Sequence, residues 1–106
     1  MINDVVKLIT ATVSTTMNTY GDYDVTRTSR EVFAGVQSVG YKEFYEAATV
    51  GLKPEIKFVL QDYEDYENEK ELAYNGIRYQ VIRTYRTQNN MLELTCGGGV
   101  RDIAYS

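Results

Sequence analysis

Asn75 and Gly76 restrict the fold more than any other pair of residues in this sequence. They lie in the run Leu-Ala-Tyr-Asn-Gly-Ile-Arg-Tyr, where strand-forming residues stand on both sides. A two-residue turn between antiparallel strands needs positive φ at both central positions, and asparagine followed by glycine meets this need at little cost. We therefore expect a β-hairpin that turns at Asn75 and Gly76, and an antiparallel sheet around it.

The rest of the chain carries the same strand signal. Ten of its 106 residues are tyrosine, one is proline, and valine and threonine are frequent. β-Branched and aromatic side chains fit a pleated, half-buried surface. Strand-like runs lie at residues 5–16, 23–39, 54–61, 72–74, 77–86 and 91–96. The predicted fold class is mainly β, a small β-barrel or rolled antiparallel sheet of about five to six strands.

The run at 23–39 is long for one strand of a small domain. Its first half is polar on both sides, whereas residues 32–39 are mostly apolar. We expect the polar half to project from the body as a hairpin arm, at about residues 15–30, together with the end of the preceding strand. Such an arm leaves backbone edges to which a partner can add a strand.

One segment has helical periodicity. Tyr41, Phe44, Tyr45 and Ala48 follow the three- and four-residue spacing of one helix face. We expect a short α-helix at about 41–49, whose aromatic stripe either packs on the sheet or forms a binding groove.

Glycine marks the expected end of the sheet. Three glycines at 97–99 follow the last strand-like run, and we expect residues 98–106 to form a flexible tail. No repeat or linker interrupts the chain, so residues 1–106 are predicted to be a single domain.

Charge is concentrated in one place. The net charge is −4, which argues against an ordinary nucleic-acid-binding protein. Residues 62–71 hold six carboxylates and one lysine, a local charge of −5, so the rest of the chain carries +1. The carboxylates are Asp62, Glu64, Asp65, Glu67, Glu69 and Glu71. Their spacing does not match a calcium loop of the EF-hand type, and we expect a long, solvated acidic loop, with weak cation binding as the alternative.

Histidine and cysteine, which serve in many catalytic and metal-binding sites, are absent or rare in this chain. The chain has no histidine and one cysteine, which excludes an internal disulfide, histidine-containing zinc sites and histidine-activated nucleophiles. Cys96 alternates with Leu92 and Leu94, so we expect it in the core. The prediction is a protein without enzymatic activity, catalytic residues, metal or cofactor. No apolar run reaches the roughly 20 residues of a membrane span.

The order of several motifs resembles a known family. A strand leads into a Glu-Phe-Tyr helix over residues 30–47, and Gly-Leu-Lys-Pro-Glu-Ile follows at 51–56. The Asn-Gly hairpin occupies residues 72–85, and Leu-Glu-Leu-Thr-Cys closes the series at 92–96. In this order and spacing the chain is similar to phage head-closure proteins, also called head-tail adaptors or stoppers, over residues 5–97.

The resemblance implies a structural virion protein. Such a protein forms a homo-oligomeric ring between the portal or connector ring and the tail, closes the channel to retain packaged DNA, and docks the tail. Its partners are the portal and tail proteins, and DNA passes without sequence-specific binding. The implied location is the virion neck, after assembly in the host cytoplasm, with the isolated subunit expected as a monomer.

Two features depart from the family pattern. The chain lacks tryptophan, and its acidic run is longer and more charged than usual. We expect the six carboxylates of residues 62–71 either to line the channel, where they would repel phosphate, or to face solvent. Candidate subunit and connector contacts are Tyr23, Arg27, Arg30, Tyr41, Phe44 and Tyr45. The alternatives are a tail-terminator or tail-completion protein and, less favoured, an acidic inhibitor or interaction protein.

Overall fold

The computed structural model describes residues 3–39 and 53–105. This part of the chain contains six strands and two single-turn 3-10 helices. The strands are β1 Asp4–Met17, β2 Tyr23–Gln37, β3 Pro54–Leu60, β4 Glu71–Tyr74, β5 Ile77–Arg86 and β6 Leu92–Arg101, and the 3-10 helices are η1 Tyr63–Asp65 and η2 Ile103–Tyr105. The prediction of a mainly β protein is confirmed.

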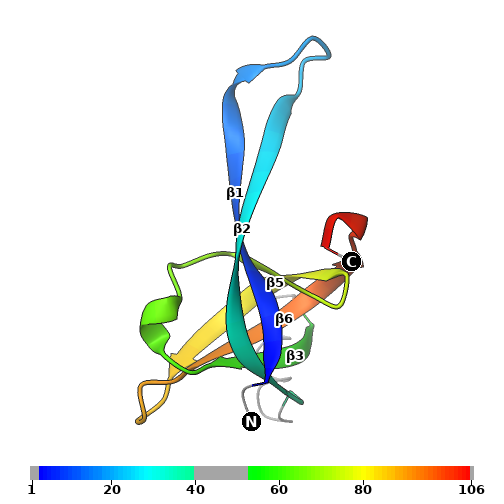
Figure 1. Ribbon diagram of the computed structural model, residues 1–106. Helices are drawn as coiled ribbons and strands as arrows, with labels where there is room; N and C mark the ends of the chain where they lie inside the picture. The colour runs from blue at the N-terminus through cyan, green and yellow to red at the C-terminus, as the bar shows by residue number, and fades with distance from the viewer. Residues whose placement is uncertain (1–2, 40–52, 106) are drawn as a thin grey trace.

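The six strands form one antiparallel sheet that closes on itself. Their order is β1-β2-β3-β6-β5-β4, and β4 pairs back with β1 at Lys7, Leu8 and Ile9 (Figure 1). The expected barrel or rolled sheet is therefore present. Closure removes most strand edges from the body of the molecule.

The core lies inside the closed sheet, where alternate residues of every strand point inward. Its largest fully buried side chains are Phe58, Leu8, Leu60, Leu72, Leu94, Val6 and Cys96. Ile9 is also fully buried, but it lies on the face of β1 opposite to that of Leu8. Phe58 packs edge-on against Tyr74, with ring centroids 5.4 Å apart. The inward position of Cys96 beside Leu92 and Leu94 confirms the expectation from the alternation.

The Asn-Gly hairpin is confirmed. Asn75 has a φ of 52° and Gly76 a φ of 75°, and Tyr74 pairs with Ile77 across the turn. The local sequence was sufficient here because both positions need a backbone conformation that few residue types adopt.

The strands β1 and β2 extend well beyond the closed sheet. They pair with each other from Asp4 opposite Ala34 to Met17 opposite Tyr23. The neighbouring strands accompany them only near the base, since β4 reaches β1 as far as Ile9 and β3 reaches β2 as far as Ala34. The remainder projects as a two-stranded arm (Figure 1), and the molecule measures 48 × 30 × 23 Å. The predicted arm is thus present.

The glycines at 97–99 do not end the last strand. Strand β6 continues through them to Arg101, so residues 98–101 belong to the sheet and not to a tail. A Cβ atom at Gly97 would lie 2.1 Å from the carbonyl oxygen of Lys53, which shows that glycine permits the close approach of the chain entering β3.

The predicted helix at 41–49 lies outside the described residues, and so do Tyr41, Phe44 and Tyr45. The acidic run also has different bounds from those expected. Glu71 is the first residue of β4, and η1 occupies part of the remainder.

Candidate functional site

The most organised polar cluster in the described chain lies where the arm leaves the closed sheet. We call it the arginine–carboxylate junction. It consists of Arg27, Arg30, Glu67, Glu69, Glu71, Arg78 and Asp102. These residues come from β2, the acidic segment, β4, β5 and the end of β6, so the junction joins segments that are distant in the sequence.

Glu71 is the centre of the outer half of the junction. Its side chain is 12% exposed and accepts hydrogen bonds from Arg27 Nε at 2.9 Å and from Arg78 Nη1 at 2.5 Å. Burial by itself would raise the pKa of Glu71, but the hydrogen bonds and charges of the two arginines hold that pKa below its ordinary value. Glu71 is therefore a charged residue that ties the arm strand β2 to β5.

Arg78 extends this chain of charges to the C-terminal turn. Its Nε atom donates to Asp102 at 3.0 Å, and this hydrogen bond lowers the pKa of the Asp102 carboxyl group. The backbone of Asp102 donates to the carbonyl of Gly76, and its carboxylate accepts from the Ala104 amide. The segment after β6 is thus held against the β4–β5 hairpin.

The inner half of the junction is centred on Glu69. Its side chain is 3% exposed and accepts from Arg30 Nε at 2.8 Å, while Glu67 lies 3.1 Å from the same nitrogen. Arg30 also donates to the carbonyl oxygen of Asp65. Tyr66 donates to the carbonyl of Glu69 at 2.5 Å, and burial together with the Glu69 charge raises the pKa of Tyr66 to about 12. The acidic segment is therefore fastened to the base of the arm.

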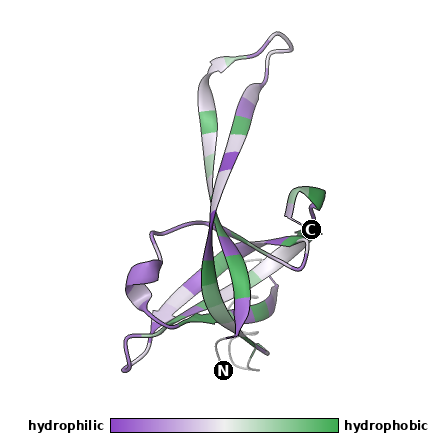
Figure 2. Ribbon diagram, viewed as in Figure 1, coloured by the Kyte–Doolittle hydropathy of each residue, from purple (hydrophilic) through white to green (hydrophobic). Residues whose placement is uncertain are grey.

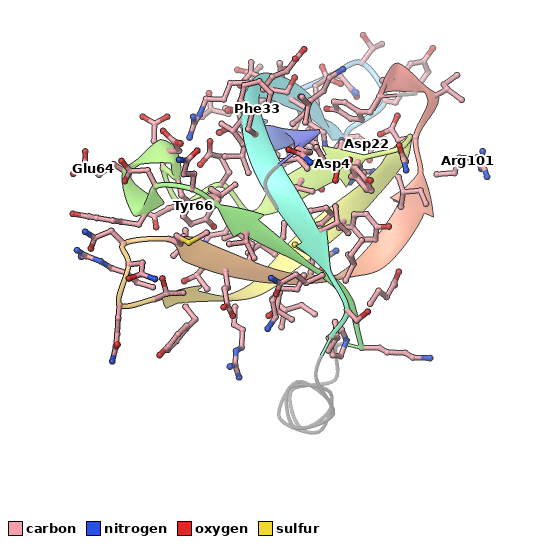
Figure 3. The ribbon with its side chains drawn as sticks, turned by 60° about the horizontal axis from the view of Figure 1, so that its bottom comes forward. Asp4, Asp22, Phe33, Glu64, Tyr66 and Arg101 are labelled. Carbon is pink, nitrogen blue, oxygen red and sulfur yellow. The ribbon has the colours of Figure 1, made fainter. Side chains whose placement is uncertain are left out.

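The six predicted carboxylates consequently do not form one solvated loop. Glu69 and Glu71 are buried and paired, whereas Asp62, Glu64, Asp65 and Glu67 are exposed. Figure 3 shows Glu64 pointing away from the sheet and Tyr66 lying against it. The Asp62 carboxylate accepts from the Glu64 amide at 2.9 Å and so caps η1.

The sequence indicates on which faces of β2 Arg27 and Arg30 lie, but not which carboxylates they meet. Arg27 and Arg30 are three residues apart on β2, so they point to opposite faces of the strand, and each needs its own acidic partner. The partners lie 44 residues away at Glu71 and 39 residues away at Glu69. The periodicity of one strand cannot identify residues at such separations.

The predicted contact residues divide into two groups. Tyr23 is 52% exposed on the arm and is available to a partner. Arg27 and Arg30 are paired with carboxylates of their own subunit, and their role at a subunit contact stays a prediction.

The arm has two unlike faces, although its sequence suggested a ribbon that is polar on both. Val13 lies opposite Val25 and Met17 opposite Tyr23 on one face, and all four side chains are about half exposed. The other face carries the threonine pairs Thr10 with Thr28 and Thr12 with Thr26. Figure 2 shows the resulting apolar bands on the arm.

Two open pockets flank the base of the arm. One, of about 260 Å³, is lined by Thr10, Ala11, Arg27 and residues 67–71. The other, of about 240 Å³, is lined by residues of β1 and β2 together with Glu67 and Glu69. The buried carboxylates that line them, Glu69 and Glu71, are already paired with arginine.

The described residues contain no cluster of candidate metal ligands. No group of three cysteine, aspartate or glutamate side chains at 3–39 or 53–105 is arranged to hold a metal ion. Burial raises the pKa of the Cys96 thiol to about 12, so this group is not a nucleophile near neutral pH.

Two comparisons with known proteins found no match to this chain. No protein-family model matches it, and no curated protein matches it. Within the described residues, no helix has the length and apolar character needed to cross a membrane. The function must therefore be argued from the geometry and from the motif order of the sequence.

Proposed function

We propose that this protein is a structural subunit of a phage virion neck. In this role it forms a ring between the portal or connector and the tail, closes the channel on packaged DNA and docks the tail. The observation that carries the proposal is the projecting arm, which exposes Val13, Met17, Tyr23 and Val25 on one face. The order of sequence motifs that resembles head-closure proteins supports it.

The arm needs a partner for its stability. A two-stranded hairpin by itself is at best marginally stable in water, because it buries little apolar surface. The arm is supported by other strands of the described chain only at its base. Contact with other subunits would bury its apolar face, which explains why a small closed sheet retains such an arm.

The exposed carboxylates suit a channel through which DNA must leave. Asp62, Glu64 and Asp65 are exposed at one side of the closed sheet. Carboxylates that line a channel repel phosphate at short range, and salt screens this repulsion beyond about 8 Å. A solvent-facing segment that keeps the free subunit soluble is the other placement for these residues.

The proposal is tested on DNA-filled heads that lack this protein. We expect the purified full chain to add a ring at one vertex, visible by negative-stain microscopy, and to restore tail attachment. Finished tails without heads are the parallel sample. A ring on tails and none on heads would replace the proposal with a tail-completion role, and binding to neither would overturn both.

A charge-mimicking inhibitor is less well supported. Such a protein presents carboxylates over its surface at spacings like those of DNA phosphates. Here Glu69 and Glu71 are buried against arginines, and the exposed carboxylates of the acidic segment lie close together in the sequence at 62–67.

A further inference from the structure

We propose that the arms of neighbouring copies pair edge to edge, with the β1 edge of one arm against the β2 edge of the next. The assembled ring would then carry a continuous antiparallel sheet made of arms. This inference rests on the proposed ring-forming function, and it names a second copy of this chain as the partner of the arm.

The first step is the location of unpaired strand edges. Beyond Ile9, β1 has β2 as its strand partner on one side and none on the other in the described chain. Before Ala34, β2 has β1 on one side and none on the other. Unpaired amide and carbonyl groups along these two edges are a template for an added strand.

The second step is the chemistry of the two edges. Residues 10–17 of β1 read Thr-Ala-Thr-Val-Ser-Thr-Thr-Met, with no charge and no proline. Charge and proline are two of the devices by which proteins block an exposed edge, and residues 10–13 of β1 carry neither. A bulge follows Val13, so the regular part of this edge is residues 10–13.

The edge of β2 differs because it carries four charged residues, Asp24, Arg27, Arg30 and Glu31. Pairing of two β2 edges centred on Arg27 would place the two Arg27 side chains opposite each other across the contact. Pairing of β2 with β1 avoids this, since β1 offers no charge there. Arg27 and Arg30 are moreover held by Glu71 and Glu69 of their own subunit.

The third step is strand direction. In a ring with cyclic symmetry all arms point the same way, so β1 runs toward the tip in each copy and β2 runs back. The β2 strand of one arm and the β1 strand of the next are then antiparallel without any rearrangement. This is a heterologous contact, the kind that builds rings, whereas pairing of β1 with β1 requires a two-fold axis and opposed arms.

The fourth step is the agreement of the two faces. With Val25 placed beside Val13 of the next arm, the apolar face becomes continuous around the ring, and so does the threonine face of Thr12 and Thr26. Each contact between neighbouring arms then covers side chains that are about half exposed in the single subunit. The register is set by this match, because a shift by one residue would place valine against threonine.

The experiment uses single-cysteine variants of the full chain, Thr12→Cys and Thr26→Cys. The native Cys96 is buried, with a raised pKa, and does not compete for thiol reagents in the folded protein. The variants are added to portal-bearing heads separately or as an equal mixture and are oxidised mildly, because a disulfide forms only where the two Cα atoms lie within about 7 Å. We expect covalent dimers in the mixture and none in either variant alone.

Each other outcome has a definite meaning. Dimers in Thr12→Cys alone would show β1 paired with β1 and would overturn the inference. Rings on heads without cross-links in the mixture would overturn the arm pairing and leave the neck function standing. Cross-links in concentrated solution without rings on heads would support the pairing and overturn the neck function. Absence of both rings and cross-links would overturn both.

A second pair of variants tests whether loss of arm pairing, rather than loss of folding, prevents ring formation. Thr12→Lys with Val13→Lys places charge on both faces of the β1 edge, outside the core. Gln88→Lys with Asn89→Lys, at the β5–β6 turn on the opposite end of the molecule, is the matched control (Figure 1). Circular dichroism should show both variants folded. We expect loss of rings in the arm variant and normal rings in the control, and normal rings in both would contradict the inference.

Discussion

At the scale of single residues, Glu71 shows how an acidic side chain can connect strands of the fold. Its carboxylate is fixed between Arg27 and Arg78 at distances of 2.9 and 2.5 Å. A buried ion pair adds little stability over a well-packed apolar pair, because desolvation offsets the attraction. Removal of one partner is nevertheless costly, since the remaining charges stay partly buried without compensation.

Glu71→Gln should therefore lower the free energy of unfolding at pH 7 by about 2 kcal/mol. The folded-state pKa of Glu71 lies below its ordinary value of 4.5. Its ionic contribution is thus fully present above that value and is lost as the pH falls through the lowered pKa. Urea denaturation at pH 7 and at about pH 3 measures both, and the difference from wild type should shrink in acid.

Glu64→Gln is the control for this change. The Glu64 side chain is exposed, so its substitution should shift the free energy of unfolding by less than about 0.5 kcal/mol at either pH. Equal losses in the two variants would show that the arginine contacts of Glu71 do not stabilise the fold.

At the scale of elements, Arg30 connects the acidic segment to the arm strand. Its guanidinium contacts Glu69, Glu67 and the carbonyl oxygen of Asp65, all on the segment that links β3 to β4. The segment has further anchors, because Tyr63 donates its amide to Asn90 and Val81 donates to Lys70. Arg30 therefore determines the order of the middle of the segment rather than its ends.

Arg30→Gln should loosen this part of the segment. The amide of Glu67 donates to Glu69 Oε1 at 2.7 Å, and the amide of Tyr66 donates to Tyr63. We expect hydrogen exchange at these two amides to rise by about tenfold, because local opening becomes easier. Mass spectrometry or NMR should show unchanged exchange at Leu94 in the core. Equal acceleration at Leu94 would indicate global destabilisation instead.

At the scale of the whole molecule, a closed body and an open arm serve different purposes. The body satisfies its strand edges by pairing around the closed sheet, so its stability depends on its own core. The arm leaves two edges and an apolar face without partners in the described chain. In the proposed ring, the base of these two strands belongs to the folded core, and their outer part makes the contact between subunits.

The charge of the molecule leads to a functional prediction at this scale. If the acidic segment faces the channel, Glu64→Gln with Asp65→Asn should alter DNA retention in assembled virions without changing the melting temperature. Retention is measured as nuclease-sensitive DNA released from purified particles. Glu55→Gln, which removes a charge from an exposed position of β3 outside the arm, is the control. Unchanged retention in both would place the acidic segment in solvent.

The strand pattern was predictable because it depends on local properties. Alternation places Phe58 and Leu60 inward, and the Asn75-Gly76 turn needs only the φ preferences of two residues. The glycine at 97 was misread because its role is set by the carbonyl of Lys53, which belongs to another strand connection. From the sequence alone, a glycine that is needed because no space is left for a side chain cannot be distinguished from a glycine that ends a strand.

The sequence by itself determined the strand content, the hairpin turn at Asn75 and Gly76, the projecting arm and the inward position of Cys96. All of these follow from side-chain periodicity and backbone preferences within a few residues. The tertiary structure decided which carboxylates remain exposed, because Arg27 and Arg30 meet Glu71 and Glu69 only after the sheet closes. It also decided that the arm has an apolar face, since this face needs the register that sets Val13 against Val25. Ion pairs and strand register depend on contacts between residues that are distant in the sequence, and these contacts exist only in the folded chain.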